Sequence, residues 1–245
     1  MKLCKNQIQK NTDKGIEKGK LSAEKQKQIF DKLSFTSNIN ELKADLLIEA
    51  IVEKLEPKVA LFEKVAELNG PHCILASNTS SIPISKIAAQ VQYPERIVGM
   101  HFFNPAHIMK LVEIISGAAT ASAVAQTVFE LAERMNKKPV FANDSPGFIV
   151  NRVARHFYVE SLLLLEENVA NHKSVDRLLK ASGFKMGPFE LMDLIGVETN
   201  FSVTSSMYES FHYDSKFRPS RIQEQKVHAG HHGRKSGKGF YDYSD

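Results

Sequence analysis

The stretch RIVGMHFFNPAHIMKLVEII, residues 96–115, contains two apolar segments of strand length separated by a short, more polar turn. His101 lies near the end of the first segment, and Glu113 lies in the middle of the second. A carboxylate inside an apolar strand costs free energy unless it is paired. The stretch therefore predicts either a hydrogen-bonded histidine–glutamate pair at the edge of a sheet, or two unrelated structural polar residues.

The segments on either side of this stretch indicate an α/β fold followed by an all-helical one. Apolar runs of strand length alternate with segments of helical periodicity as far as residue 143, and this alternation is typical of a parallel, helix-covered sheet. From Asp144 onward no convincing strand follows, and Ser145-Pro146 is expected to start a long helix. We therefore predict an α/β domain over residues 1–143 and a helical domain over residues 144–245.

Composition places the chain among globular proteins and argues against several function classes. Of 245 residues, 42% are hydrophobic and 24% are charged, and no apolar run approaches the roughly 20 residues that span a bilayer. The N-terminus has no apolar signal segment, and the two cysteines, Cys4 and Cys73, match no metal spacing. We expect a reducing, cytoplasmic setting with no membrane partner.

Positive charge gathers in residues 1–33, which hold nine lysines and four acidic residues. This pattern is typical of a solvated helix face, and it also suits a patch for a polyanionic small molecule. The segment contains no arginine, so we expect no nucleic-acid partner.

Three further groups of polar residues are candidates for a site. SNTSS, residues 77–81, follows an apolar strand and could bind a substrate oxygen or a ribose, or form an ordinary capped turn. Asn151, near the start of the long helix, could reach a site between the two halves or bond locally. The loosely spaced His228, His231 and His232 do not favour a metal site.

Six motifs in order along the whole chain resemble the 3-hydroxyacyl-CoA dehydrogenase family, including its 3-hydroxybutyryl-CoA dehydrogenases. They are DLLIEAIVE, ASNTSS, HFFNPAHIMKLVEII, DSPGFIVNR, MGPFELMDLIG and GRKSGKGFYDY. The resemblance implies an incomplete Rossmann-like dinucleotide-binding domain before a helical domain. It also implies an enzyme of fatty-acid β-oxidation or butanoate metabolism, which uses NAD for reversible oxidation of an L-3-hydroxyacyl-CoA to a 3-oxoacyl-CoA.

The same resemblance implies roles for particular residues. His101 resembles the catalytic base, Glu113 its orienting partner, and Ser80 and Asn151 the groups that bind the reacting oxygen. A further set resembles the residues beside the NAD cofactor: Ala50, Glu53, Lys58, Ser80, Asn104 and Lys235. Lysines of the N-terminal segment resemble those that meet the phosphates of the acyl-CoA substrate. A homodimer through the helical domain is expected, because LLLLEE, residues 162–167, is more apolar than one buried face needs.

One element of the family pattern is not found in the sequence. The Gly-rich turn that binds a dinucleotide pyrophosphate is absent, and Gly15 and Gly19 are spaced wrongly for it. Three explanations of this absence stay open: a truncation, a non-catalytic acyl-CoA-binding or dimer-forming relative, and a partner chain that supplies the segment. We expect cofactor binding to be impaired. A dehydrogenase of another 3-hydroxy acid, such as a sugar acid, is a further alternative that the lysine-rich opening disfavours.

Overall fold

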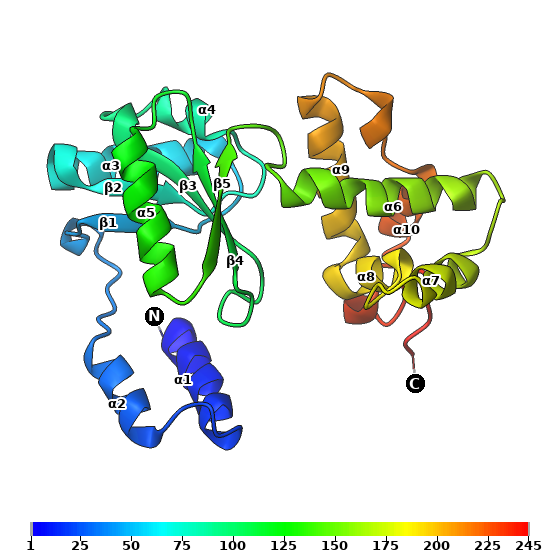
Figure 1. Cartoon of the computed structure of the whole chain (residues 1–245), viewed down its shortest axis with the longest axis horizontal. Coiled ribbons are helices and arrows are strands. Elements are labelled where there is room, and N and C mark those ends of the chain that lie inside the picture. Colours follow the sequence, from blue (N-terminus) through cyan, green and yellow to red (C-terminus); the bar gives the residue numbers. More distant parts are fainter. Residues whose placement is uncertain (1, 245) are drawn as a thin grey trace.

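The computed structural model describes residues 2–244, which form an α/β lobe and a helical lobe joined by one segment of chain (Figure 1). The first two helices, α1 (Lys2–Glu17) and α2 (Ala23–Asp31), form a separate pair below the α/β lobe in this view. Ser22 caps α2 by accepting a hydrogen bond from the Lys25 N–H at 3.1 Å. The predicted order, an α/β part followed by an all-helical part, is confirmed.

The α/β lobe contains a single five-stranded sheet with the spatial order β1-β2-β3-β4-β5. Its strands are β1 (Leu46–Glu49), β2 (Ile74–Ser77), β3 (Ile97–Phe102), β4 (Leu111–Ser116) and β5 (Lys138–Asn143). The prediction of an all-parallel sheet is wrong: β4 pairs antiparallel with β3, and the other three pairs are parallel. The eight residues between β3 and β4 are too few for the crossover that a parallel pair requires.

Helices cover both faces of the sheet because its central strands are apolar on both sides. Leu75, Ile97 and Ile115 face one layer, formed by α3 (Leu55–Asn69) and α4 (Ile84–Ala88). The alternate strand residues pack against the apolar side of α5 (Ser122–Arg134). This two-residue alternation is the period of a strand, and it places the core in two layers.

The helical lobe packs five helices around an apolar core that includes Leu162, Phe189, Met192 and Phe240. The helices are α6 (Val150–Glu166), α7 (His172–Ala181), α8 (Pro188–Ile195), α9 (Val197–Ser210) and α10 (Arg221–His228). No helix among residues 2–244 is long and apolar enough to cross a membrane.

The long helix α6 begins at Val150, later than the predicted start at Ser145-Pro146. Gly147 and Phe148 have φ values of 73° and 50°, and this left-handed conformation interrupts helical geometry before Val150. Gly147 also leaves no room for a side chain, since a Cβ there would lie 2.8 Å from Met207 Cε. The interruption turns the chain out of the sheet and into the helical lobe.

Asp144, at the end of β5, provides an anchor for this junction. Its two carboxylate oxygens accept the N–H groups of Ile84 at 2.9 Å and Ser85 at 2.7 Å, at the start of α4. The side chain therefore caps a helix that lies 60 residues earlier in the chain.

We predict that Asp144→Ala lowers the free energy of unfolding by about 1–2 kcal/mol, as expected for a lost N-terminal cap. Asp144→Asn keeps one acceptor oxygen and should lose about half as much. Urea denaturation monitored by circular dichroism measures both changes, with Asn143→Ala at the exposed neighbouring position as the control. An unchanged midpoint for Asp144→Ala would show that the cap contributes nothing.

Candidate active site

The antiparallel pairing of β3 and β4 places His101 directly opposite Glu113. His101 Nδ1 lies 2.8 Å from Glu113 Oε2, and the two side chains are 7% and 0% exposed. The ring of His101 is flanked by Phe103 and Phe148, with centroid distances of 4.6 Å and 5.8 Å. The predicted pair is thus present, and it is shielded from water.

The second oxygen of Glu113 reaches the helical lobe. Oε1 accepts the backbone N–H groups of Ile149 and Val150, both at 2.9 Å, where α6 begins. A carboxylate at this position satisfies N–H groups that have no partner within the helix and lies at the positive end of the helix dipole. Glu113 therefore connects the base on β3 to the first turn of α6.

These contacts determine the ionisation state of the pair. Burial alone would raise the pKa of Glu113, but the hydrogen bonds from His101, Val150 and Ile149 outweigh burial and hold its pKa below the ordinary value. An ionised Glu113 has no proton to donate, so it accepts the Nδ1–H of His101. In the tautomer that carries its proton on Nδ1, the imidazole has its lone pair on Nε2. No described residue forms a hydrogen bond to Nε2, so this nitrogen can take a proton from a ligand.

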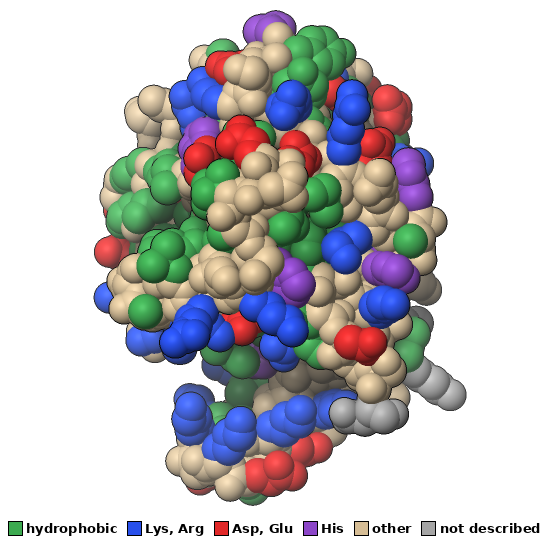
Figure 2. Space-filling model, turned by 90° about the vertical axis from the view of Figure 1, so that its right-hand side faces the viewer, with side chains coloured by type: hydrophobic (Ala, Val, Ile, Leu, Met, Phe, Trp, Pro, Cys, Tyr) green, Lys and Arg blue, Asp and Glu red, His purple; other side chains and the backbone are tan. Residues whose placement is uncertain are grey.

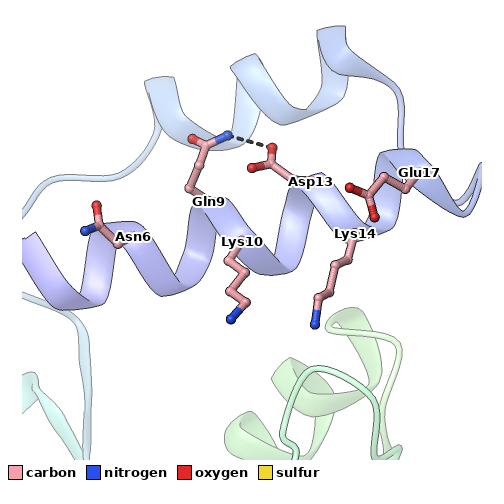
Figure 3. A pocket seen from close by; sticks show the side chains of 6 residues that line it. All are labelled: Asn6, Gln9, Lys10, Asp13, Lys14 and Glu17. Atoms are coloured by element: carbon pink, nitrogen blue, oxygen red, sulfur yellow. Dashed lines mark hydrogen bonds between the residues drawn. The ribbon is translucent and has the colours of Figure 1, made fainter.

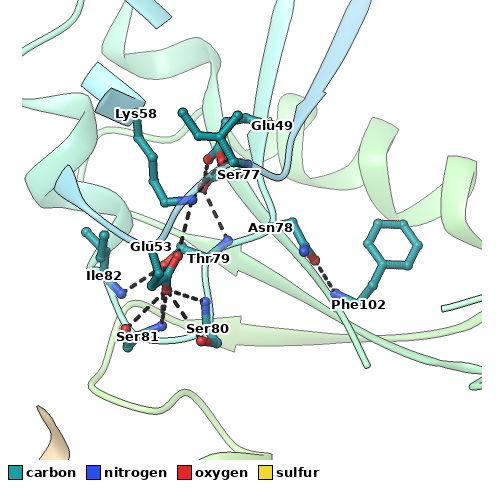
Figure 4. A network of polar contacts seen from close by, with 11 residues as sticks. Glu49, Glu53, Lys58, Ser77, Asn78, Thr79, Ser80, Ser81, Ile82 and Phe102 are labelled. Atoms are coloured by element: carbon teal, nitrogen blue, oxygen red, sulfur yellow. Dashed lines mark hydrogen bonds and ion pairs between the residues drawn. The ribbon is translucent and has the colours of Figure 1, made fainter. Parts of the chain in front are cut away.

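A second polar network lies at the ends of β1 and β2 (Figure 4). Glu53 Oε1 accepts Thr79 Oγ1–H at 2.6 Å and the backbone N–H groups of Ser80 and Ser81 at 2.8 Å and 3.1 Å. Lys58 is 1% exposed and lies between the carboxylates of Glu49 and Glu53. The SNTSS segment is therefore an ordered turn held by a carboxylate.

Two contacts connect the SNTSS turn to the strand of His101 and to the helical lobe. Asn78 Oδ1 accepts the backbone N–H of Phe102 at 2.8 Å, immediately after His101. Asn151 Nδ2, on the first turn of α6, lies 3.4 Å from the backbone oxygen of Ser80. The four predicted catalytic residues thus form two contacting pairs, His101 with Glu113 and Asn151 with Ser80. Glu113 connects the pairs, because it also bonds the start of the helix that carries Asn151.

Other predicted residues lie farther from this group. Asn104 is exposed on the turn between β3 and β4, and Ala50 is exposed just beyond β1. Lys235, on the short 3₁₀ turn Arg234–Ser236, pairs with Glu198 of the helical lobe and has no polar contact with the α/β lobe. Their roles beside a cofactor stay predictions.

The sequence analysis missed Glu49, which is 2% exposed at the end of β1 and bonds both Lys58 and Ser77. Asn78, within the predicted SNTSS segment, joins the turn to β3. A charged residue at the end of the apolar run DLLIE was the available signal for Glu49. Among residues 2–244 no group of three or more metal-binding side chains is present.

The carboxyl ends of β1, β2 and β3 meet at one edge of the sheet, where α/β folds bind nucleotides. The exposed side chains of Ile51 and Val52 offer apolar surface to the flat nicotinamide ring of NAD. Ser80 and Glu53 offer a hydroxyl and a carboxylate to its amide. These side chains could hold the nicotinamide end of the cofactor, and the turn that carries Ser80 is connected through Asn78 to the strand that carries His101.

A buried imidazole at this edge of the sheet, beside a helical lobe, is an arrangement that suits a nicotinamide-linked oxidoreductase. Two family profiles match the chain: "3-hydroxyacyl-CoA dehydrogenase, NAD binding domain" over residues 1–145, and "3-hydroxyacyl-CoA dehydrogenase, C-terminal domain" over residues 147–243. The chain belongs to the 3-hydroxyacyl-CoA dehydrogenase family, an EC 1.1.1 oxidoreductase family, as the six motifs predict.

Individual relatives agree with the family profiles. The 3-hydroxyadipyl-CoA dehydrogenase of Escherichia coli is 47% identical over 93% of this chain, which spans only about half (48%) of that relative. A probable 3-hydroxybutyryl-CoA dehydrogenase of Bacillus subtilis is 40% identical over 97% of this chain and 83% of its own length. The comparisons give no support to the expectation of impaired activity.

Solved structures show the same fold. The crystal structure of 3-hydroxybutyryl-CoA dehydrogenase from Escherichia coli superposes with a TM-score of 0.95 at 46% identity, covering 97% of this chain and 51% of that one. The structure of (S)-3-hydroxybutyryl-CoA dehydrogenase from Ralstonia eutropha gives a TM-score of 0.94 at 35% identity, covering 98% and 85%.

We predict that Glu113→Gln lowers the free energy of unfolding near neutral pH by about 2–4 kcal/mol, because it removes the charge that three donors stabilise. The folded-state pKa of Glu113 is depressed, so its contribution is present above the ordinary pKa of 4.5 and is lost as the pH falls through the folded-state pKa.

Urea titrations at about pH 7 and about pH 4 should therefore show the difference between wild type and Glu113→Gln shrinking in acid. Glu133→Gln, at an exposed position on α5, serves as the control and should change little at either pH. A difference that stays constant or grows in acid would contradict the assignment of an ionised Glu113.

Proposed function

We propose that this chain catalyses the reversible oxidation of an L-3-hydroxyacyl-CoA to a 3-oxoacyl-CoA with NAD, and that His101 is the catalytic base. The observation that carries the proposal is the buried hydrogen bond between His101 Nδ1 and Glu113 Oε2, in a chain of this family. Such a pair presents a basic Nε2 to a hydroxyl group.

The proton and the hydride pass from the substrate to two different acceptors. His101 Nε2 takes the proton of the C3 hydroxyl while the C3–H bond breaks, and C3 becomes a carbonyl carbon. NAD, when bound, supplies the hydride acceptor at its nicotinamide ring. Glu113 then faces a protonated imidazole and stabilises it, and base assistance of this kind contributes about 10²–10⁴-fold to the rate.

Ser80 and Asn151 are proposed to bind the C3 oxygen opposite His101. A hydroxyl and an amide that donate hydrogen bonds to this oxygen polarise the carbonyl as it forms. The 3.4 Å contact between Asn151 Nδ2 and the backbone oxygen of Ser80 supports a shared position for the two groups. Ser80 lies in the α/β lobe and Asn151 lies in the helical lobe, so the C3 oxygen of a bound substrate would accept hydrogen bonds from both lobes.

The lysine-rich helix α1 is proposed to meet the phosphates of CoA. Lys10 and Lys14 project from the same side of α1, away from α2, and line a hollow of about 420 Å³ (Figure 3). Lysine side chains also gather along the separate helical pair at the bottom of the space-filling view (Figure 2). An ammonium group binds phosphate as a point charge.

The printed names of the relatives suggest the acyl groups to test. One relative acts on 3-hydroxyadipyl-CoA and another on 3-hydroxybutyryl-CoA, so short acyl chains with and without a terminal carboxylate are the first substrates for this chain. The ratio of their kcat/KM values measures the preference directly.

A homodimer through the helical lobe is also proposed, on different residues from those expected. LLLLEE is not the exposed surface, because Leu162 is buried and the following leucines are partly buried. An apolar hollow of about 630 Å³ lies instead on α6 and the α7–α8 connection, lined by residues that include Val153, Phe157 and Phe184. Val153 is 70% exposed and Phe184 is 50% exposed, which is the kind of surface that a second subunit covers.

We predict that His101→Asn lowers kcat by about 10²–10⁴-fold with little change in the KM for acetoacetyl-CoA, because it removes the base and leaves substrate binding intact. Oxidation of NADH measured by absorbance gives both constants. His107→Asn, six residues further on at an exposed position, is the control and should keep wild-type activity. Binding of the CoA ester without turnover by the wild-type chain would favour a non-catalytic acyl-CoA-binding protein.

We predict that Val153→Asp converts the dimer into a monomer in sedimentation velocity, because it places a charge on the apolar surface. Val169→Asp, at another exposed position 65% accessible but outside the hollow, should leave the dimer intact. A wild-type chain that sediments as a monomer would contradict the proposed dimer.

A further inference from the structure

Glu49 is a buried carboxylate with no role in the reaction described above. It ends β1 and is 2% exposed. Its Oε1 accepts Lys58 Nζ and the backbone N–H of Ile51, both at 2.7 Å, and its Oε2 accepts Ser77 Oγ–H at 2.7 Å. Three donors on one buried carboxylate hold the end of β1, the start of α3 and the end of β2 together.

Lys58 connects the two carboxylates of this group. It is 1% exposed, and its Nζ lies 2.7 Å from Glu49 Oε1 and 3.2 Å from Glu53 Oε2. The ammonium group therefore lies between Glu49 and Glu53, and a change at one carboxylate is passed to the other through it.

Glu53 is the member of the group that meets the active-site turn. Its side chain is 37% exposed, and its Oε1 accepts hydrogen bonds from Thr79, Ser80 and Ser81 (Figure 4). Burial alone would raise the pKa of Glu53, but the hydrogen bonds from Thr79 and Ser80 and the charge of Lys58 hold it below its ordinary value. The carboxylate thus stays ionised and keeps its hydrogen bonds from these three residues.

Charge balance explains why Glu49 matters to this turn. Two carboxylates around one ammonium group let Lys58 divide its hydrogen bonds between them. If Glu49 lost its charge, the buried ammonium group would have a single anionic partner and would draw Glu53 inward, because an uncompensated buried charge is strongly unfavourable. Glu53 would then release the N–H groups of Ser80 and Ser81.

We propose that Glu49 is a positioning residue that sets the Ser80 turn through Lys58 and Glu53. The consequence for cofactor binding rests on the proposed function. The structural relation between Glu49 and the turn can be measured without any ligand.

The experiment compares amide hydrogen exchange in wild type, Glu49→Gln and Lys58→Met by mass spectrometry or NMR. Exchange of the Ser80 and Ser81 amides should become about tenfold faster or more in both variants, because their acceptor moves away. The Ile149 and Val150 amides, which bond Glu113, are the internal control and should exchange at the wild-type rate. Glu67→Gln, in an exposed ion pair of α3, is the matched control variant.

A second readout is the dissociation constant of NADH from fluorescence titration, which should rise by about tenfold in both variants, with a smaller change in kcat. The double variant Glu49→Gln with Lys58→Met should bind NADH no more weakly than either single variant, because both act through one path. If Glu49→Gln does not fold, Lys58→Met alone still has to loosen the Ser80 and Ser81 amides.

Wild-type exchange at Ser80 and Ser81 in a folded Glu49→Gln chain would overturn the proposal. So would wild-type exchange at these amides in a folded Lys58→Met chain, because the path from Glu49 to the turn runs through Lys58. If the wild-type chain neither binds NADH nor turns over substrate, the proposed function fails, and the exchange rates still decide the positioning role.

Discussion

The carboxylate of Glu113 is the interaction on which the rest of the site depends. It is fully buried on β4 and bonds His101 through one oxygen and the first N–H groups of α6 through the other. An unpaired carboxylate in this position would cost several kcal/mol, about the whole margin of stability of a domain. The same three hydrogen bonds that offset this cost orient the imidazole and place Asn151 on the side of the site.

The polar network around Glu49, Lys58 and Glu53 follows the same physical rule at the neighbouring strands. Buried charge is tolerated where every oxygen has a donor, and here the donors are the backbone and hydroxyl groups of the turn that follows β2. The contact of Asn78 with the backbone of Phe102 connects this network to β3. The site therefore lies on rigid strand ends, which suits a reaction that needs atoms held within a fraction of an ångström.

The sequence was sufficient for the strands and for the change to helices, because these follow from local apolar patterning. The cost of a buried charge made the pairing of His101 with Glu113 one of two alternatives. It was misleading about strand direction. An apolar run has the same pattern in either direction, and only the short connection between β3 and β4 excludes a parallel crossover. The exposed apolar surface was likewise placed on LLLLEE, whereas packing in the helical lobe covers those leucines and leaves Val153 exposed.

By itself, the sequence determined which residue types stand at the ends of the strands and that the chain has an α/β part and a helical part. Local periodicity carries this information, because side chains repeat every two residues in a strand and every 3.6 in a helix. Only the tertiary structure decided that His101 lies across from Glu113, that Glu113 also holds α6, and that Lys58 is enclosed by two carboxylates. Those contacts join residues separated by between 5 and 37 positions, and they exist only once the sheet has paired and the helices have packed.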